Sequence, residues 1–301
     1  MNKIVFILLL FLSCLKSFGQ QEAQYSQYMY NMNMVNPAYV VNEPGTLYLG
    51  SLYRMQWAGI EGAPRTANVF ANMSLSDKTE LSFNYTNDQI GDVLQENTFN
   101  VDFAYILNLS RYTRLSFGMK AGVSNLAFDF SGTNVGADPS FLNTTNTLMN
   151  IGAGLFLYSD NFYVGLSSPN VLPTDLNVNS QDLYETETQM FAMAGYIIDV
   201  NRGLRLKPSA VVKQSIGAPL SFDVSMNALF NEKFEFGLSY RYQDAVSALA
   251  AINLAYNFKI GYAYDYSTSK LNSFNSGSHE IILLYNFDFL RSKKYFSPRF
   301  F

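Results

Sequence analysis

Near its end the chain reads Gly277-Ser278-His279-Glu280-Ile281-Ile282-Leu283-Leu284-Tyr285-Asn286-Phe287-Asp288-Phe289. Successive side chains of a β-strand point to opposite faces, so this stretch predicts a strand with one apolar and one polar face. The apolar face would carry Ile281, Leu283, Tyr285, Phe287 and Phe289. A strand of this kind, repeated along a chain that begins with a signal peptide, is typical of a transmembrane β-barrel of a Gram-negative outer membrane.

The first 19 residues predict a secretory signal peptide. Lys3 precedes the apolar run from Ile4 to Leu12, and Ser17-Phe18-Gly19 offers the small residues that signal peptidase prefers, so cleavage is expected after Gly19. The alternative is an uncleaved anchor, but the run is shorter than the about 20 residues that a spanning helix needs. Cleavage would also remove Cys14, the only cysteine, which excludes disulfides, thiol catalysis and cysteine metal sites.

Charge and composition point to a membrane and away from nucleic acid. The chain carries 20 Lys and Arg against 24 Asp and Glu, and loss of Lys3 and Lys16 with the signal peptide leaves 18 against 24, a net charge of −6. Such a chain lacks the basic patch that nucleic acid requires. Charged residues are 15% of the chain and aromatic residues 16%, whereas soluble domains carry about 25% charged residues. Scarce charge with abundant Tyr and Phe suits a lipid-facing sheet.

The same alternation recurs along most of the chain. In the stretch from Thr98 to Leu109, Phe99 and Phe103 share one face, while Asn100 and Asp102 share the other. A shift by one residue would place charges in lipid, at about 2–4 kcal/mol for a Lys or Arg at the midplane, so the pattern assigns each face. Fourteen such strands are predicted, over residues 46–56, 65–75, 80–87, 96–108, 113–126, 148–158, 161–168, 188–199, 204–213, 220–230, 233–242, 245–256, 258–267 and 277–289.

The long connections between these strands fall on one side only. The even-numbered connections are all short, whereas the odd-numbered ones include those near residues 88–95, 127–147, 169–187 and 268–276. Outer-membrane barrels have short periplasmic turns and longer extracellular loops, and the alternative of a β-sandwich does not explain one-sided loops. The expected fold is therefore all-β: a transmembrane antiparallel up-and-down β-barrel of about 14 strands over residues 45–289, with a polar lumen.

The polar faces would line the lumen with charges of both signs. These are Arg54, Asp102, Lys120, Arg205, Lys207, Lys213, Asp223, Glu235, Arg241, Lys259, Asp265 and Glu280. Buried charges generally need partners, so opposite charges are expected to pair across the interior and to leave a filled or plugged lumen. The alternative is an ion-selective channel, but aqueous pores usually need about 16 or more strands or a cleared centre.

Two segments lie outside the expected strands. Residues 20–44 are polar and aromatic without alternation, and their Tyr and Met content favours a segment packed in the lumen or across its periplasmic mouth. Residues 290–301 form a basic, aromatic tail on the periplasmic side. A docking peptide and a plainly solvated tail are both open for this end of the chain.

Candidate catalytic and metal-binding residues are few. His279 is the only histidine, and Ser278-His279-Glu280 cannot form a catalytic relay because neighbouring strand residues point to opposite faces. Gly152-Ala153-Gly154 lies within a strand, so it is no phosphate-binding loop and is expected to permit curvature or close packing. The expected protein has no enzymatic activity, no cofactor and no metal site.

Several segments of the chain resemble the PorP/SprF family of type IX secretion system outer-membrane proteins. They are Tyr25-Ser26-Gln27-Tyr28, Asn36-Pro37-Ala38, Tyr53-Arg54-Met55-Gln56-Trp57-Ala58-Gly59, Gly62-Ala63-Pro64, Phe162-Tyr163-Val164-Gly165-Leu166-Ser167, Tyr264-Asp265, Gly277-Ser278-His279-Glu280-Ile281 and Pro298-Arg299-Phe300. These segments follow one another in the family's order and cover essentially the whole mature chain.

The resemblance implies a non-enzymatic barrel that assists secretion and surface anchoring of a large protein, such as an adhesin with a gliding-type C-terminal domain. It implies that protein and other type IX components as partners, beside outer-membrane lipid. The motif positions carry over without individual roles: Arg54, Gln56, Trp57, Asp265, His279 and Glu280 as family-motif or lumen candidates, and Tyr25, Ser26, Gln27, Asn36, Pro37 and Ala38 in the N-terminal motif. A small-solute transporter or porin-like channel is the alternative function.

One contact between motif positions is predicted. Arg54 and Glu280 both project toward the lumen, from the first and the last strand. These strands become neighbours when a barrel closes, so we expect an ion pair between Arg54 and Glu280 across the closing seam.

Overall fold

The structure is a computed structural model that describes residues 25–40, 45–132, 142–178, 181–216, 218–255 and 257–289. The signal peptide predicted for residues 1–19 and the basic tail predicted for residues 290–301 lie outside the described residues. The same holds for residues 20–24 and 41–44 of the N-terminal segment. Those predictions stay predictions.

Strands dominate the described residues, with three short 3-10 helices between or before them. The helices are η1 (Tyr28–Tyr30), η2 (Met32–Met34) and η3 (Lys270–Ser273). The strands are β1 (Thr46–Met55), β2 (Arg65–Ser76), β3 (Thr79–Ile90), β4 (Leu94–Asn108), β5 (Arg114–Phe128), β6 (Thr144–Tyr158), β7 (Phe162–Ser168), β8 (Thr174–Val178), β9 (Gln181–Thr186), β10 (Gln189–Tyr196), β11 (Ile198–Asn201), β12 (Leu204–Ser215), β13 (Ser221–Phe230), β14 (Phe234–Arg241), β15 (Ala245–Ala255), β16 (Phe258–Ser267) and β17 (Ser278–Asp288).

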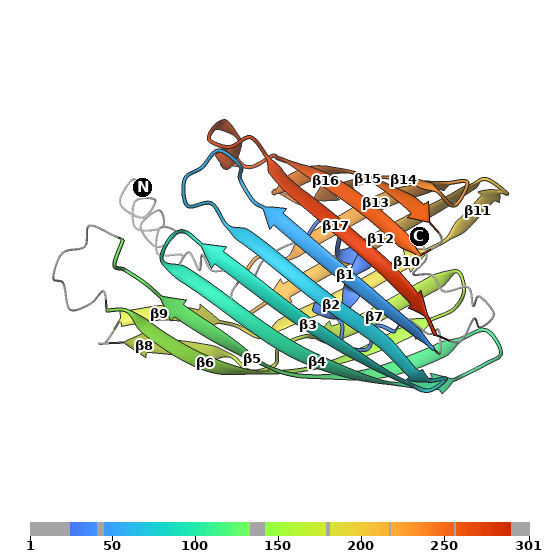
Figure 1. Cartoon of the computed structure of the whole chain (residues 1–301), viewed down its shortest axis with the longest axis horizontal. Helices are drawn as coiled ribbons and strands as arrows, with labels where there is room; N and C mark the ends of the chain where they lie inside the picture. The colour runs from blue at the N-terminus through green and yellow to red at the C-terminus, as the bar shows by residue number, and fades with distance from the viewer. Residues whose placement is uncertain are drawn as a thin grey trace, which may run out of the picture.

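The large sheet closes on itself to form a barrel (Figure 1). Neighbouring strands are antiparallel; β10 pairs with β7 on one side and β12 on the other, and β1 pairs with β17. β11 continues β10 after a break at Ile197 and pairs with the same strand, β12. With β10 and β11 taken as one, the barrel has 14 strands, which confirms the predicted fold class.

The main departure from the predicted strands lies at the extracellular ends. β6 begins at Thr144, four residues before the predicted start, and the predicted loop at 169–187 contains the hairpin β8–β9. Both stretches consist largely of Thr, Asn, Asp and Gln. The apolar–polar alternation that marks a strand is therefore weak there, because neither face of these stretches meets lipid.

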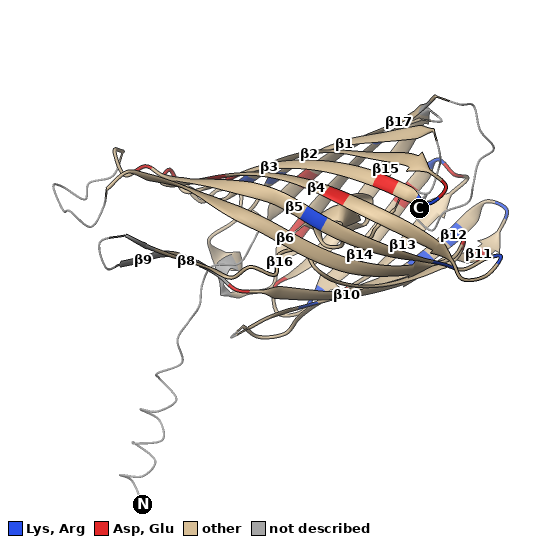
Figure 2. Cartoon of the chain, turned by 90° about the horizontal axis from the view of Figure 1, so that it is seen from below, with Lys and Arg blue, Asp and Glu red and all other residues tan. Residues whose placement is uncertain are grey.

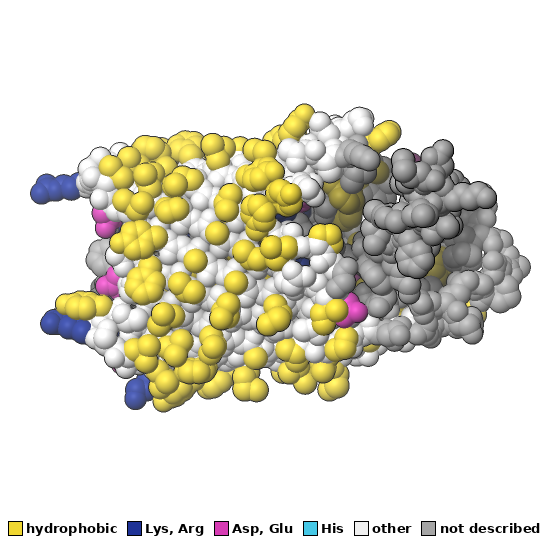
Figure 3. Space-filling model, turned by 180° about the vertical axis from the view of Figure 1, so that it is seen from behind, with side chains coloured by type: hydrophobic (Ala, Val, Ile, Leu, Met, Phe, Trp, Pro, Cys, Tyr) yellow, Lys and Arg dark blue, Asp and Glu magenta, His cyan; other side chains and the backbone are white. Residues whose placement is uncertain are grey.

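The two faces of the wall alternate as expected. On β5, Phe117 and Met119 are exposed on the outer face, whereas Ser116 and Lys120 are buried on the inner face. Figure 3 shows hydrophobic side chains spread over one flank, with the prominent charged side chains at its ends. Figure 2 shows that few strand positions carry charge. Among the described residues, no helix has the length and apolar character needed to cross a membrane.

The short turn between β13 and β14 uses a backbone conformation that suits the twist of a hairpin. Asn231 and Glu232 join β13 to β14 with φ angles of 49° and 57°, and the Lys233 N–H donates to Phe230 O at 2.9 Å. Positive φ at both central residues defines the turn type whose twist matches that of paired strands. This turn lies at the end of the barrel opposite the long loops, which is the periplasmic end in outer-membrane barrels.

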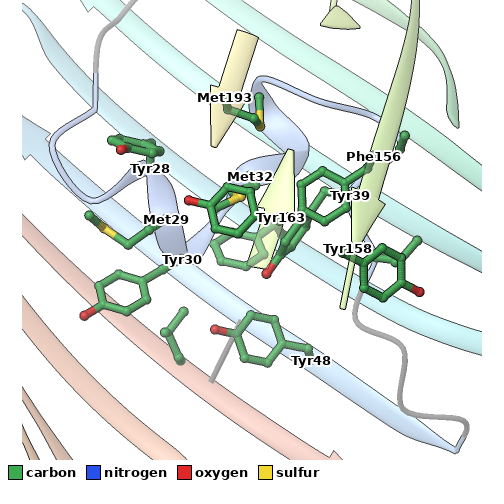
Figure 4. Close-up of a cluster of buried hydrophobic side chains, with 14 of the residues drawn as sticks. Tyr28, Met29, Tyr30, Met32, Tyr39, Tyr48, Phe156, Tyr158, Tyr163 and Met193 are labelled. Carbon is green, nitrogen blue, oxygen red and sulfur yellow. The ribbon is translucent and has the colours of Figure 1, made fainter. Parts of the chain in front are cut away.

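Residues 25–40, here called the lumen segment, lie inside the barrel. Apolar side chains of the segment pack against aromatic side chains of the wall, and together they form a core within the lumen (Figure 4). Members of this core include Tyr28, Met29, Tyr30, Met32 and Tyr39 from the segment, and Tyr48, Phe156, Tyr158, Tyr163 and Met193 from the wall. The interior of this barrel is thus packed with side chains at the level of the segment.

Candidate functional site in the barrel lumen

A buried charged cluster joins three neighbouring strands near the extracellular end of the lumen. Strand pairing places Arg54, the second-last residue of β1, directly opposite Glu280 of β17. Arg54 Nη1 lies 3.1 Å from Glu280 Oε2, and Arg54 Nη2 lies 2.8 Å from Asp265 Oδ2 on β16. The predicted ion pair across the closing seam is therefore confirmed. Asp265 is a second partner that the sequence analysis did not assign to Arg54.

The lumen segment completes this cluster. The backbone N–H groups of Ser26 and Gln27 donate to the two carboxylate oxygens of Glu280, at 3.0 Å and 2.8 Å. Ser26 Oγ lies 2.6 Å from both carboxylate oxygens of Asp265 and accepts a hydrogen bond from Arg54 Nη1 at 3.2 Å. We call these five residues, Ser26, Gln27, Arg54, Asp265 and Glu280, the charged anchor.

The charged anchor depends on every one of its members. All five residues are buried, and one guanidinium faces two carboxylates. The N–H groups and the hydroxyl of the lumen segment supply the remaining donors that buried carboxylates require. Removal of one partner from a buried ion pair costs about 3–5 kcal/mol, because the other charge stays buried alone. The lumen segment and the three charges that join β1, β16 and β17 therefore stabilise each other.

Neutral polar contacts continue along the middle of the lumen segment. Asn31 Nδ2 donates to Asn68 Oδ1 on β2 at 2.9 Å, and Asn33 Nδ2 donates to Ser82 Oγ on β3 at 3.2 Å. Lys120 on β5 donates from Nζ to Asn33 O at 2.9 Å. Three strands of the wall, β2, β3 and β5, therefore hold the middle of a segment whose regular structure is limited to two short helical turns.

The motif Asn36-Pro37-Ala38 is held mainly by shape. A Cβ atom on Gly118 would overlap the backbone of Pro37 and Ala38, and one on Gly154 or Gly165 would overlap the side chain of Asn36. Asn36 Nδ2 uses this space to donate to Leu155 O at 3.1 Å, while Asn36 Oδ1 accepts from Ala38 N–H at 2.9 Å. We call Gly118, Gly154 and Gly165 the glycine cradle. The prediction that Gly154 permits close packing is confirmed.

A second charged pair touches the aromatic part of the segment. Lys259 Nζ on β16 lies 2.9 Å from Glu235 Oε2 on β14, and Asn227 Nδ2 donates to Glu235 Oε1 at 2.7 Å. The same ammonium lies 4.9 Å from the ring centre of Tyr30. A cation over an aromatic face is attracted to it, so this pair also helps to hold the segment in the lumen.

Gln56 and Trp57 lie in the loop after β1, not in the lumen. Trp57 has a φ of 49°, and its N–H donates to Ser278 Oγ at 3.1 Å. The next residue, Ala58, donates its N–H to Gly277 O at 2.7 Å. These two motif segments therefore meet at the extracellular rim, where they join the loop after β1 to the start of β17.

His279 also lies outside the lumen, on the outer face of β17. Its Nδ1 atom is 2.7 Å from the hydroxyl of Tyr262, a neighbour on β16. Of the six family-motif or lumen candidates, only Arg54, Asp265 and Glu280 line the interior. Within the described residues, no group of three or more His, Cys, Asp or Glu could hold a metal ion.

The wall residues that receive the lumen segment were not predicted from the sequence. Gly118, Gly154 and Gly165 occupy inward-facing positions on the three consecutive strands β5, β6 and β7. Small inward-facing residues on adjacent strands were the available signal, because they mark a place where another segment approaches the wall. Ser167, which donates to Val35 O at 2.6 Å, carried no such signal.

The packed lumen and the converging motif segments agree with a comparison to protein families. A family described as type IX secretion system membrane protein PorP/SprF matches residues 17–285. The chain belongs to the PorP/SprF family. As a PorP/SprF protein with a 14-strand barrel, it is a type IX secretion component of a Gram-negative outer membrane. A search of curated proteins finds no match to the chain.

Solved structures share the fold of this PorP/SprF protein. The toluene transporter TbuX of Ralstonia pickettii is 11% identical with a TM-score of 0.55, and the match covers 88% of this chain and 94% of that one. The toluene transporter TodX of P. putida is 9% identical with a TM-score of 0.52, covering 87% and 95%. The monoaromatic hydrocarbon channel CymD is 11% identical with a TM-score of 0.51, covering 91% and 95%.

Proposed function

We propose that this barrel holds a large secreted protein at the outer face of the membrane during type IX secretion. The partner in this proposal is a surface protein such as an adhesin with a gliding-type C-terminal domain. The observation that carries the proposal is the filled lumen: residues 25–40 occupy it, and a buried charged anchor fixes them to the wall. We infer that a barrel whose lumen is occupied in this way acts through its surfaces.

The extracellular loops offer such a surface. The loop after β1 is joined to the start of β17 by backbone hydrogen bonds, so this part of the rim is ordered rather than free. Strands β4, β5 and β6 are 15 residues long, and Leu94, Phe128 and Thr144 bring one end of each to the extracellular side. An ordered rim supports binding because less conformational entropy is lost when a partner docks.

A small-solute transporter is the second candidate. The fold resemblance to proteins described as toluene transporters favours it, although at 9–11% identity that resemblance concerns the fold alone. The two candidates differ in what the lumen does. A transporter must move the lumen segment aside or pass solute around it, whereas an anchoring barrel keeps the segment in place.

Two measurements on the intact protein separate the candidates. Tagged protein is purified from native outer membranes in mild detergent, and co-purifying proteins are identified by mass spectrometry. The same preparation is tested for conductance in planar bilayers. Recovery of a large secreted protein through its C-terminal domain, with a silent bilayer, is the result we expect. A bare barrel with steady conductance would replace the anchoring role by the transporter.

A further inference from the structure

The extracellular ends of β3 to β6 extend beyond the part of the sheet that the neighbouring strand β7 pairs with. β4, β5 and β6 have 15 residues each, against 7 in β7 and 8 in β10. The outward side chains change from apolar to polar between two successive rows of paired residues. The lower row is Tyr85, Phe99, Val123 and Met149, and the upper row is Asn87, Asn97, Asn125 and Thr147. Amide and hydroxyl groups on the outer face place the upper row beyond the lipid.

β6 has an unpaired edge in this extended part. It pairs with β5 along its whole length, but with β7 only from Ala153 to Tyr158. The last bond on this side joins Val171 N–H to Ile151 O at 2.7 Å. Backbone groups of alternate strand residues point the same way, so those of Thr145, Thr147 and Met149 also point away from β5. No strand among the described residues pairs with them.

The β8–β9 hairpin does not cover this edge. Its two strands form a separate sheet with each other, and Tyr184 of β9 donates its hydroxyl to Glu96 Oε2 on β4 at 3.2 Å. Glu96 lies two strands away from the edge, on the inner face. The hairpin is therefore tied to the inside of the extended sheet, and the edge of β6 stays unpaired in the described chain.

The edge lacks the features that usually prevent strand addition. Residues 144–150 read Thr-Thr-Asn-Thr-Leu-Met-Asn, with no charge and no proline. Natural proteins blunt exposed edges with Lys, Pro, bulges or a covering segment, since unpaired N–H and C=O groups invite another strand. Seven residues also match the common length of a β-strand, which is about 5–6 residues.

We propose that this edge of β6 binds one extended strand of a protein outside the cell, which adds to the sheet through main-chain hydrogen bonds. Strand addition draws its affinity from the backbone, so side chains of the partner need only be uncharged and polar beside Thr145 and Thr147. A second copy of this barrel is the weaker candidate. Two copies in one membrane share an orientation, so their β6 edges could meet only as a parallel ladder, which is the less stable pairing per residue. Identification of the strand with the anchored secreted protein rests on the proposed function.

Hydrogen exchange tests whether the edge is open in the purified barrel. We expect the amides of Thr145 and Thr147 to exchange fast, while those of Asn146 and Leu148, which face β5, exchange slowly. Fast exchange follows because an unpaired amide on the extracellular side is exposed to water. Slow exchange at Thr145 and Thr147 as well would overturn the proposal, since another strand would then already occupy the edge.

Proline substitution tests whether the edge binds the secreted protein. Thr147→Pro removes an edge N–H without breaking a backbone bond to β5. Both Thr147→Pro and Thr147→Ala lose the side-chain hydrogen bond from Asn125 Nδ2 to Thr147 Oγ1, but only Thr147→Ala keeps the edge N–H. In the pull-down from native outer membranes, we expect Thr147→Pro to recover roughly ten-fold less secreted protein and Thr147→Ala to match the wild type. Equal recovery by both variants would overturn the edge site and leave the anchoring function standing. Failure of the wild type to recover any secreted protein would overturn both.

Discussion

The two ends of the lumen segment are held to the wall in opposite ways. At one end, Ser26 and Gln27 enter a buried cluster of one guanidinium and two carboxylates. At the other end, Asn36-Pro37-Ala38 fills space that three glycines leave open, with hydrogen bonds to neutral groups. The first contact joins β1, β16 and β17 at the closing seam, and the second uses β5, β6 and β7.

This difference teaches how a barrel can fill its own lumen without a continuous apolar interface. A buried ion pair holds its partners firmly, but loss of any one partner leaves a buried charge unpaired at a large cost in free energy. Close packing against glycine needs no partner group, but it tolerates no added side chain. Because the segment is fixed at two separate parts of the wall, detachment at one end leaves the other in place. The four changes below test that separation.

The largest effect is expected from Arg54→Met. Removal of the guanidinium leaves Asp265 and Glu280 buried side by side without a cation, at a cost of about 3–5 kcal/mol. Urea unfolding in lipid vesicles measures this loss, and bilayer conductance reports whether the lumen opens. Arg65→Met is the control, because Arg65 is exposed at the start of β2. An equal effect of both variants would show that the cluster does not hold the segment.

Gly118→Ala tests the glycine cradle. The new Cβ overlaps the backbone of Pro37 and Ala38, and overpacking of this kind costs about 1–3 kcal/mol. We expect lower stability together with faster hydrogen exchange at Ala38, while the amides of Ser26 and Gln27 stay protected. The control is Gly132→Ala, where an added Cβ meets no atom within 4 Å. Loss of protection at both ends would contradict independent attachment.

Ser26→Ala probes the charged anchor from the side of the segment. The hydroxyl lies 2.6 Å from both carboxylate oxygens of Asp265, and hydrogen bonds to charged groups contribute about 1.5–3 kcal/mol. A loss near the lower value is expected, because Arg54 still pairs with Asp265. Ser51→Ala, on the exposed outer face of β1, is the matched control for urea unfolding. Stability equal to the wild type would mean that the backbone N–H groups alone anchor this end.

A double-mutant cycle measures how much the ion pair between Arg54 and Glu280 contributes to barrel stability. Arg54→Met and Glu280→Gln, alone and together, should show a coupling free energy of about 1 kcal/mol or more, because the two side chains are 3.1 Å apart and buried. In the Glu280→Gln variant, Arg54 still pairs with Asp265. This remaining ion pair limits the coupling free energy between Arg54 and Glu280. Additive losses in unfolding free energy would mean that the pair contributes nothing specific to closure.

Much of the barrel wall was predictable, because the alternation of apolar and polar residues lies within each strand. The number of strands, their order and the direction of each side chain follow from a two-residue period that lipid imposes on every strand. The pairing of Arg54 with Glu280 was predictable for the same reason, since closure makes the first and last strands neighbours. The hairpin β8–β9 and the early start of β6 were not, because polar residues outside lipid carry no such period.

By itself, the sequence determined that this chain forms an outer-membrane barrel with charges turned inward, because the cost of a charge in lipid constrains each strand separately. Only the tertiary structure decided that Ser26 meets Glu280 across 254 residues, and that Gly118, Gly154 and Gly165 receive Asn36-Pro37-Ala38. It alone also decided that, among the residues that the structure describes, the outer edge of β6 has no partner strand. Such contacts depend on strand register and on closure of the ring, which no local pattern in the chain encodes.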